Sequence, residues 1–407
     1  MTALVRSFAA LRPTAESAAE VIAPPYDVVS TEEARALAAG RPRSFLHISR
    51  PEIDLPEGSS PYSDAAYGQG ARSLERLVAE GALVRDEPSF YVYRMVMDGR
   101  VQTGVAFVAS VRAYEQNRIR RHERTRPDKE NDRVRNIATL NAQTGPVLLA
   151  YRANPALRSV LAAAANAAPL FSVAGPNDVL HTVWRASPAT AAALQAELGS
   201  LDALYIADGH HRSAAAARVA AERRGAPDAS HEFFLAVAFP HDEMRILDYN
   251  RVVRDLNGLS PDAFLARIRE SFDVAELPAG RSPPQTQTFS MYLGNRWYEL
   301  KLRALPAPAH DPVANLDVSQ LQDRLLAPIL GIGDPRTDPR IDFVGGIRGL
   351  PELERRVQSG RAAVAFALHP TQMVQLMAVA DANELMPPKS TWFEPKLADG
   401  LLSHVLD

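Results

Sequence analysis

The sequence predicts an α+β protein, that is, a mixed α/β fold. Apolar runs of strand length and segments of helical periodicity alternate along all 407 residues, without an internal repeat or a long low-complexity tract. Hydrophobic residues make up 46% of the chain and charged residues 23%, which is the composition of a globular protein with a substantial core. This length predicts two or three domains, or one large elaborated domain.

Helices are predicted from capping residues, apolar spacing and alanine content. Ser30 and Glu33 form a capping box at the start of one helix, and Gly40 ends it. Arg126-Pro127 precedes a densely charged helix that runs to Leu140. In chain order, the predicted helices span residues 16–22, 31–39, 65–80, 127–140, 155–168, 189–198, 210–224, 318–326, 350–358 and 371–380.

Strands are predicted where apolar residues run together between turn signals. Asp98-Gly99 separates two such runs, which predicts a β-hairpin. Two prolines in Ala23-Pro24-Pro25-Tyr26-Asp27-Val28 exclude a helix there and predict an extended or turn conformation. In chain order, the predicted strands span residues 45–48, 90–97, 101–111, 145–151, 181–185, 203–207, 233–239, 247–253, 290–292, 297–302 and 362–368, and residues 331–346 are expected to be a loop.

The chain is expected to fold as two regions. After Asp255-Leu256-Asn257-Gly258 the pattern of residue types changes, and a proline-rich break follows at residues 278–284. We therefore expect a first region of residues 1–255 and a C-terminal region of residues 256–407.

Composition excludes several classes of function. The chain has no Cys, which excludes disulfides, thiol catalysis, zinc–cysteine sites and iron–sulfur clusters. The net charge of 45 − 48 = −3 argues against a broad nucleic-acid-binding surface. No apolar stretch is long enough for a membrane helix, and the charged N-terminus lacks the apolar run of a signal peptide. We expect a cytoplasmic protein without a membrane partner, and its oligomeric state stays open.

The strongest chemical signal is the segment Tyr205-Ile206-Ala207-Asp208-Gly209-His210-His211-Arg212-Ser213. A buried strand is predicted to end at Asp208-Gly209, and an Ala-rich helix begins on the two histidines. The unpaired N–H groups and partial positive charge of a helix N-terminus bind anions, phosphates above all. Arg212 adds bidentate contacts to phosphate oxygens. Alternatively, Asp208 is only an N-cap and the histidines a polar helix start; Asp208 could also hold a metal or act as a base.

A second signal is the stretch of mixed charge from Arg120 to Arg133. A solvated helix face is the usual explanation of such a stretch. However, it lies between apolar strands and contains acid–base neighbours such as His122-Glu123. A nucleoside triphosphate with Mg²⁺ needs this mixture, with arginines for phosphate and carboxylates for metal or proton transfer. Both explanations stay open.

Common nucleotide and hydrolase motifs are missing from the sequence. It has neither the spacing of a Walker loop nor a Gly-x-Gly-x-x-Gly fingerprint after a strand. It also lacks His-Glu-x-x-His and Gly-x-Ser-x-Gly, which argues against a zinc hydrolase and a standard α/β-hydrolase. In the C-terminal region, Gly345-Gly346 permits close backbone approach, and Lys389-Ser390-Thr391 is a candidate phosphate-facing loop.

Over essentially its full length, the chain resembles the domain-of-unknown-function family 1015 of bacteria and some archaea. The matching pieces are Ala23-Pro24-Pro25-Tyr26-Asp27-Val28, Arg50-Pro51-Glu52, His122-Glu123-x-Thr125, Lys129-Glu130-x-Asp132-Arg133, Ala207 to Arg212, Tyr249-Asn250-Arg251-Val252-Val253, Arg340 to Gly346 and Met386 to Lys396.

The Asp-Gly-His-His-Arg segment also resembles a motif of archaeal free serine kinases, which share a fold with ParB partition proteins and sulfiredoxin. This local resemblance implies a ParB/sulfiredoxin-like nucleotide-binding core with a C-terminal α/β elaboration. It implies that Asp208 is an active-site acid and that Gly209, His210, His211 and Arg212 bind phosphate. Sulfiredoxin chemistry needs a Cys, so that activity is excluded here.

Glu130-Asn131-Asp132-Arg133 is similar to the Glu-Asn-x-x-Arg box of ParB proteins, where an acid and an arginine meet the triphosphate and metal. Kinase-like relatives also use an acidic residue near the N-terminal side to activate the serine hydroxyl. The further expected site residues are His122, Arg133 and Lys389 for phosphate, Asp132 with Asp208 for metal, and Asp27, Glu123, Glu130 and Asp208 as candidates for the catalytic carboxylate.

The leading hypothesis is a small-molecule kinase that uses Mg²⁺ and transfers a phosphoryl group from ATP or ADP to a hydroxyl. Free L-serine is the best candidate acceptor, and O-phosphoserine would be the product. Its expected partners are a nucleotide and a small polar hydroxyl substrate, not nucleic acid. The alternative is a nucleotide-binding regulatory module similar to the CTP switch of ParB proteins. A third possibility is an enzyme of different chemistry on the same scaffold, because a fold does not fix a function.

Overall fold

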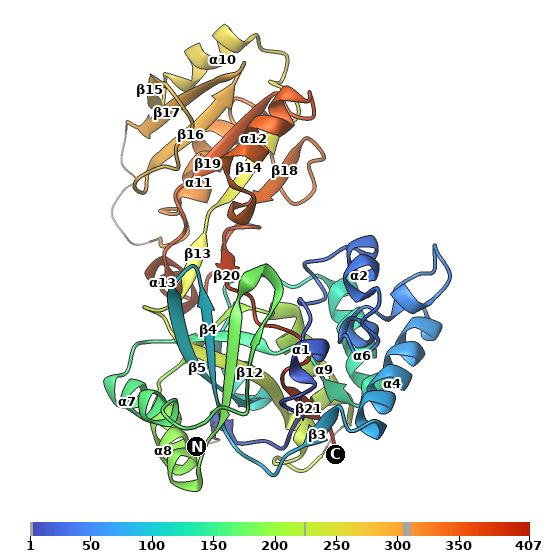
Figure 1. The fold of residues 1–407 in the computed structure, drawn as a ribbon. Coiled ribbons are helices and arrows are strands. Elements are labelled where there is room, and N and C mark those ends of the chain that lie inside the picture. Colours follow the sequence, from blue (N-terminus) through green and yellow to red (C-terminus); the bar gives the residue numbers. More distant parts are fainter. Residues whose placement is uncertain (1–2, 224, 304–310) are drawn as a thin grey trace. The chain divides into compact units, whose positions relative to one another are not determined.

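Two compact units make up the computed structural model, which describes residues 3–223, 225–303 and 311–407. Unit 1 comprises Met1–Met244 and Pro395–Asp407, and unit 2 comprises Arg245–Glu394 (Figure 1). This division differs from the predicted regions 1–255 and 256–407. The first unit ends earlier, and the last residues of the chain return to it because they pair with its strands.

A mixed sheet organises unit 1. Among the described residues it has nine strands in the order β6-β11-β8-β12-β5-β4-β10-β9, with β1 paired to β5. The pairs β11–β6 and β12–β8 are parallel, and the other pairs are antiparallel. The strands are β1 (Val5–Arg6), β4 (Tyr91–Met97), β5 (Arg100–Ser110), β6 (Ile119–Arg120), β8 (Val147–Tyr151), β9 (Phe171–Ala174), β10 (Leu180–Arg185), β11 (Leu204–Asp208) and β12 (Phe233–Pro240).

Helices pack against this sheet in unit 1. The helices of this unit are α1 (Ala18–Val21), α2 (Thr31–Ala38), α3 (Leu46–Ser49), α4 (Asp64–Ala79), α5 (Val111–Glu115), α6 (Pro127–Leu140), α7 (Pro155–Ala164), α8 (Pro188–Gly199) and α9 (His210–Arg223), with short 3₁₀ turns at Pro51–Asp54, Pro176–Asp178 and Ser230–Glu232. Apolar side chains of α7, α8 and α9 pack in one core cluster with strand residues such as Phe107, Leu149 and Ile206. This burial explains why the strands are nearly continuous apolar runs in the sequence.

A small second sheet holds both ends of the chain in unit 1. Its strand order is β3-β2-β21-β7. The strands are β2 (Ala10–Pro13), β3 (Leu83–Arg85), β7 (Ala142–Gln143) and β21 (Ser403–Val405). Because β21 bonds to both β2 and β7, the residues just before it, which include Lys396 and Asp399, belong to unit 1.

Unit 2 is an antiparallel sheet with helices. Among the described residues its main sheet has the order β15-β17-β16-β19-β14-β18, and β13 pairs with β20. The strands are β13 (Arg245–Leu247), β14 (Tyr249–Val253), β15 (Phe272–Leu277), β16 (Thr288–Leu293), β17 (Arg296–Leu302), β18 (Ile341–Gly345), β19 (Val364–Leu368) and β20 (Trp392–Glu394). The helices are α10 (Pro261–Ile268), α11 (Asp317–Leu321) with a π-turn at Gln322–Leu326, a 3₁₀ turn at Gly346–Arg348, α12 (Gly349–Gln358) and α13 (Met373–Asp381).

The mixed α/β class is confirmed, as are the predictions that rest on local signals. The Ser30 hydroxyl accepts the Glu33 N–H at 3.2 Å, and Glu33 accepts the Ser30 N–H at 2.8 Å. Asp98 and Gly99 both have positive φ, as a tight hairpin turn requires. Across the described parts of the chain, no helix combines the length and the apolar character needed to cross a membrane.

Several predicted elements are wrong or incomplete. Residues 45–48 were predicted as a strand, but Leu46–Ser49 forms a helix that packs on α4, because a short apolar run has no decisive period. The predicted strand 247–253 is divided at Asp248 into β13 and β14. The predicted loop 331–346 contains β18, which pairs with β14. Arg224, the predicted end of α9, lies outside the described residues.

Candidate functional site

The junction between β11 and α9 has the predicted strand–glycine–helix form. β11 ends at Asp208, after a register shift that begins at Ile206, and α9 starts at His210. Gly209 has a φ of +99°, and a Cβ there would lie 3.0 Å from Nε of Arg212. Only glycine therefore suits this position. The N–H groups of Arg212 and Ser213 donate to the Gly209 carbonyl at 2.9 and 3.1 Å, so those of His210 and His211 are the first-turn donors that an intrahelical acceptor does not engage.

Asp208 is an ionised carboxylate held by two cations. Its Oδ2 accepts a hydrogen bond from Nη2 of Arg212 at 3.1 Å and lies 3.8 Å from Nζ of Lys396. Burial by itself raises the pKa of Asp208, but the positive charges of Lys396 and Arg212 outweigh it and hold that pKa well below its usual value. Such a carboxylate orients cations well but is a weak proton acceptor.

Arg212 is buried and fixed at two points. Besides Asp208, its guanidinium donates to the backbone carbonyl of Pro146 at 2.6 Å. Burial disfavours its charged form, but Asp208 and the nearby carboxylate of Asp27 raise the pKa of Arg212 above its usual value. The result is a permanent positive charge directly behind the helix N-terminus.

Two imidazoles and a carboxylate meet beside this junction. The rings of His122 and His210 are perpendicular, with centroids 4.5 Å apart, and Nδ1 of His210 lies 3.8 Å from Oε2 of Glu123. Burial lowers the pKa of His122 to about 4 and holds that of His210 well below its ordinary value. Both rings are therefore neutral at pH 7. His211 accepts the backbone N–H of Arg126 at its Nε2, at 3.0 Å.

The ParB-like box places Arg133 and Asp132 in a buried pair. Arg133 donates twice to Oδ2 of Asp132, at 2.9 and 2.7 Å, and the Tyr67 hydroxyl donates to Oδ1 at 2.7 Å. The Arg133 guanidinium also lies 3.8 Å from the ring centre of Tyr26. Since both oxygens of Asp132 have protein partners, Asp132 is poorly placed to serve as a metal ligand.

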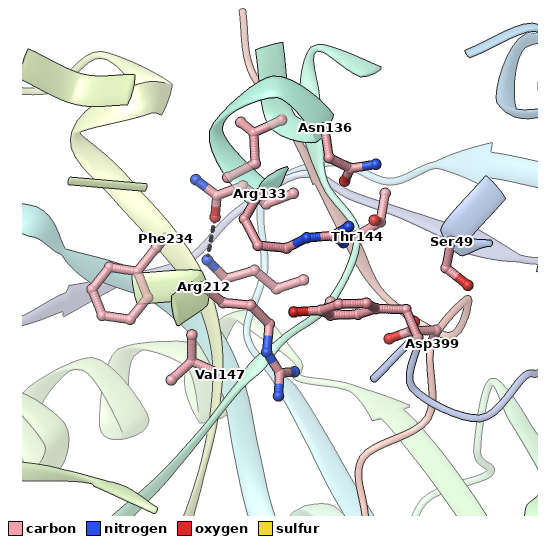
Figure 2. A pocket seen from close by; sticks show the side chains of 13 residues that line it. Ser49, Arg133, Asn136, Thr144, Val147, Arg212, Phe234 and Asp399 are labelled. Atoms are coloured by element: carbon pink, nitrogen blue, oxygen red, sulfur yellow. Dashed lines mark hydrogen bonds between the residues drawn. The ribbon is translucent and has the colours of Figure 1, made fainter. Parts of the chain in front are cut away.

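A small cavity lies beside Arg133 and Arg212 (Figure 2). Its volume is about 20 Å³, which is room for about one water molecule. Oδ1 of Asp399 and Oγ of Ser49 are buried at its wall without a hydrogen-bond partner. Burial raises the pKa of Asp399 to about 7, although Arg212 counteracts that shift. Asp399 thus exchanges its proton near neutral pH.

The Ala23–Val28 segment belongs to this site. Ala23 and Asp399 exchange backbone hydrogen bonds of 3.2 and 3.0 Å, which fixes the double-proline turn. Tyr26 then stacks on Arg133, and Asp27 is exposed. The simple structural turn that the sequence suggested therefore also presents a carboxylate near Arg212 and His211. Burial lowers the pKa of His211, and the charge of Asp27 opposes that shift.

Two further predicted site residues make other contacts. The Glu130 carboxylate lies 3.6 Å from Arg218, a residue of α9, and its charge also acts on His211, where it opposes the lowering of the pKa by burial. Lys389 belongs to unit 2, where its Nζ lies 5.7 Å from the ring centre of Tyr249. The structure thus gathers Asp208, Gly209, His210 and Arg212 with His122 and Glu123, and it pairs Arg133 with Asp132.

Sequence reasoning missed Lys396 and Asp399 as site residues. Lys396 is the last residue of the family-like segment Met386 to Lys396, in which only Lys389-Ser390-Thr391 was given a role. Asp399 precedes Gly400, which has a φ of +89°, so this Asp-Gly pair repeats the dipeptide at Asp208-Gly209. This repeated Asp-Gly pair was the signal in the sequence that could have pointed to Asp399 as a site residue.

Three side chains that can bind a metal gather beside the β11–α9 junction. Within the described parts of the chain, His122, Glu123 and His210 form a group of donor atoms within 4.8 Å of one another. Asp208 and Asp132, the residues predicted to hold a metal, are not members of this group.

The fold and the site define a mixed α/β protein with a charged strand–glycine–helix junction. The sequence model of the family described as "Protein of unknown function (DUF1015)" matches residues 5–319, and the chain belongs to this family. The family resemblance is therefore confirmed over residues 5–319, while the family-like segments Arg340 to Gly346 and Met386 to Lys396 lie outside the matched range. No curated protein matches the sequence.

Solved structures that match this chain include the following three. A free serine kinase in complex with AMP shares 13% identity, with a TM-score of 0.34, over 71% of this chain and 86% of that one. A conserved hypothetical protein from Pyrococcus furiosus shares 12% identity, with a TM-score of 0.35, over 75% and 97%. SbnI with a C-terminal truncation, from Staphylococcus aureus, shares 12% identity, with a TM-score of 0.38, over 72% and 85%.

Proposed function

We propose that this protein is a small-molecule kinase that transfers a phosphoryl group from ATP or ADP to a hydroxyl, with free L-serine as the favoured acceptor. The observation that carries the proposal is the β11–Gly209–α9 junction. There, Asp208, Arg212 and Lys396 lie beside the first turn of a 14-residue helix. Helix N-termini bind phosphate groups, and fixed cations strengthen that binding.

Phosphoryl transfer requires positioning and charge neutralisation more than covalent catalysis. The first-turn N–H groups of His210 and His211 would donate to phosphate oxygens. Because Nε2 of His211 accepts the Arg126 N–H, its neutral ring carries the proton on Nδ1 and can also donate. Lys396 and Arg212 would neutralise charge on the transferred group.

Mg²⁺ is proposed to enter with the nucleotide. Asp208 fits as its protein carboxylate because it stays ionised, whereas both oxygens of Asp132 are already bonded. When bound, the ion would supply further neutralisation of phosphate charge.

Asp27 is the best-placed acceptor for the proton of the substrate hydroxyl. It is exposed, and its charge acts on His211 and Arg212 at the start of α9. Asp208 is too weak a base because its pKa is lowered. In the transfer, the acceptor oxygen bonds to phosphorus, the bond to the leaving nucleotide breaks, and the hydroxyl proton passes to Asp27.

Mass spectrometry of a reaction with Mg²⁺, ATP or ADP, and L-serine tests the proposal. O-phosphoserine should form, and Asp208→Asn should abolish it. Asp242→Asn is the matched control, because Asp242 only pairs with Arg158 at the surface of the same unit. Asp27→Asn should lower kcat by about 10²-fold or more while nucleotide still stabilises the protein against heat.

Two negative results have different meanings. Thermal stabilisation by a nucleotide without phosphoserine would reject serine as the acceptor and favour the regulatory module similar to the ParB switch. The absence of both product and stabilisation would leave the junction as an ordinary helix start.

A further inference from the structure

His122, Glu123 and His210 come from two segments of unit 1 that meet beside the β11–α9 junction. His122 and Glu123 follow β6, and His210 is the first residue of α9. The two imidazoles are nearly fully buried, at 2% and 4% exposure, while the Glu123 side chain is 41% exposed. One donor atom from each residue lies within 4.8 Å of the others. The cluster is thus fixed on its histidine side and adjustable on its carboxylate side.

The state of His122 is the second observation. Both of its ring nitrogens are buried and make no hydrogen bond within ordinary limits. Leaving a buried polar group unpaired is costly, so such a ring calls for a missing partner. Burial lowers the pKa of His122, and the nearby backbone carbonyl of Ile206 opposes that shift. Metal-bound histidines commonly direct their other N–H at a backbone carbonyl in this way.

His210 can provide the second nitrogen. The backbone N–H of His122 lies 3.5 Å from its Nε2, a long and weak contact that does not fix the tautomer. Its Nδ1 faces Glu123 at 3.8 Å. Metal ligands must be unprotonated, and both buried rings are neutral at pH 7.

We infer that His122, Glu123 and His210 form a binding site for a divalent transition-metal ion, for which Zn²⁺ is the best probe. Two imidazoles and one carboxylate suit zinc and its neighbours, whereas Mg²⁺ prefers oxygen ligands alone. At Zn–N and Zn–O distances of about 2.0–2.2 Å, ligand atoms lie about 3.3 Å apart, so the cluster closes by small shifts of Glu123 and the rings.

Three protein ligands leave a coordination position open. Because His210 is the first residue of α9, the ion would lie beside the helix start that is proposed to bind phosphate. A water molecule, a carboxylate or a phosphate oxygen would complete the coordination. The site does not depend on the proposed kinase activity, because the ion binds without a nucleotide.

Isothermal titration of the full-length, metal-depleted protein with Zn²⁺ tests the inference. We expect one ion per chain, unaffected by millimolar Mg²⁺. His122→Ala and His210→Ala should each weaken binding by about 100-fold or more, since even supporting residues of metal sites contribute 10–100-fold. Visible absorption of the Co²⁺-loaded protein should show the bands of a low-coordinate site, and the same variants should lose them.

His47→Ala is the matched control, because His47 also faces a carboxylate, that of Asp54 at 2.8 Å, but has no second imidazole. It should bind Zn²⁺ as the unchanged protein does. The His122→Ala and His210→Ala variants change buried residues, so the Glu123→Gln variant keeps the test valid if those two misfold, because the Glu123 side chain is half exposed. Glu123→Gln should weaken Zn²⁺ binding about tenfold or more. Absence of a stoichiometric site, or equal binding by the Glu123→Gln and unchanged proteins, would overturn the inference. Phosphoserine formation is measured separately, so the two proposals can fail independently.

Discussion

Arg212 and Arg133 in unit 1 keep only 9% and 12% of their side-chain surface exposed, and each is bonded to a carboxylate. Unit 2 also has close ion pairs; that of Glu352 with Arg356 is partly buried, but that of Asp334 with Arg336 lies at the surface, with 40% and 55% exposure. Surface pairs are screened by water and salt and contribute little to folding. Buried pairs carry a large desolvation penalty and strongly shift the pKa of their neighbours.

The pKa values of the carboxyl groups show the effect of this difference in burial. In unit 2, hydrogen bonds from Arg336 lower the pKa of Asp334 to about 2, so it is simply an ionised surface group. In unit 1, the pKa of Asp208 is held well below its usual value, while burial raises that of Asp399 to about 7. In unit 2, burial also raises the pKa of Asp317 to about 6, but in unit 1 the oppositely shifted Asp208 and Asp399 both act on one buried cation, Arg212. Carboxyl groups with opposite shifts around one charged group are typical of a functional site.

The largest effect is expected from Arg212→Ala. It leaves Asp208 without its closest cation and the Pro146 carbonyl without its donor. Breaking such a buried pair should lower the free energy of unfolding by about 3 kcal/mol. Urea denaturation measures this loss of unfolding free energy, provided that the m-value is unchanged. A loss below about 1 kcal/mol would mean that the buried pairs of unit 1 are energetically like surface pairs.

The second prediction concerns pH. Because the pKa of Asp399 is higher in the folded than in the unfolded chain, its protonated form stabilises the fold, and that stability is lost as pH rises from about 4 to about 7. The slope should reach at most about 1.4 kcal/mol per pH unit.

Asp399→Asn should flatten the dependence of unfolding free energy on pH in this window. Asp334→Asn is the control; its lowered pKa acts in the opposite direction, with stability lost only as pH falls toward 2. An identical pH dependence in the Asp399→Asn and unchanged proteins would show that Asp399 does not titrate near neutrality.

A smaller effect should separate two glycines with positive φ. At Gly209 an alanine would be strained and would also press on Arg212, whereas a Cβ at Gly258 in unit 2 meets open space. Gly209→Ala should cost about 2 kcal/mol and Gly258→Ala about 1 kcal/mol, the latter from backbone strain alone. Thermal unfolding compares them, and equal losses would show that the contact with Arg212 is easily relieved.

Arg336→Ala should have the smallest effect. Its pair with Asp334 is local and exposed, so the urea midpoint should not move measurably. A clear destabilisation would remove the contrast between the two units.

Predictions that depend on neighbouring residues were confirmed. The Ser30–Glu33 capping box, the Asp98-Gly99 hairpin and the strand–glycine–helix junction at Gly209 are each specified within a few positions. Where the local signal was weak, the prediction failed. Residues 45–48 were predicted as a strand, but Leu46–Ser49 is a helix, because packing against α4 determines its conformation.

The partners of the site residues could not be predicted in this way. Asp132 was expected at a metal, but Tyr67, which is far away in the sequence, occupies one of its oxygens. Lys396 reaches Asp208 only because the end of the chain returns to unit 1. No periodicity or spacing reports such contacts.

The sequence by itself determined the mixed α/β class, most of the helices and strands, the family, and the identity of the charged junction at Asp208 to Arg212. These follow from short-range preferences of the backbone and from motif residues that are adjacent in the chain. Only the tertiary structure decided that Asp208 stays ionised, that Asp399 titrates near pH 7, and that His122 meets His210. The reason is physical: burial and the distance between charges set these properties, and both depend on segments that meet only after folding.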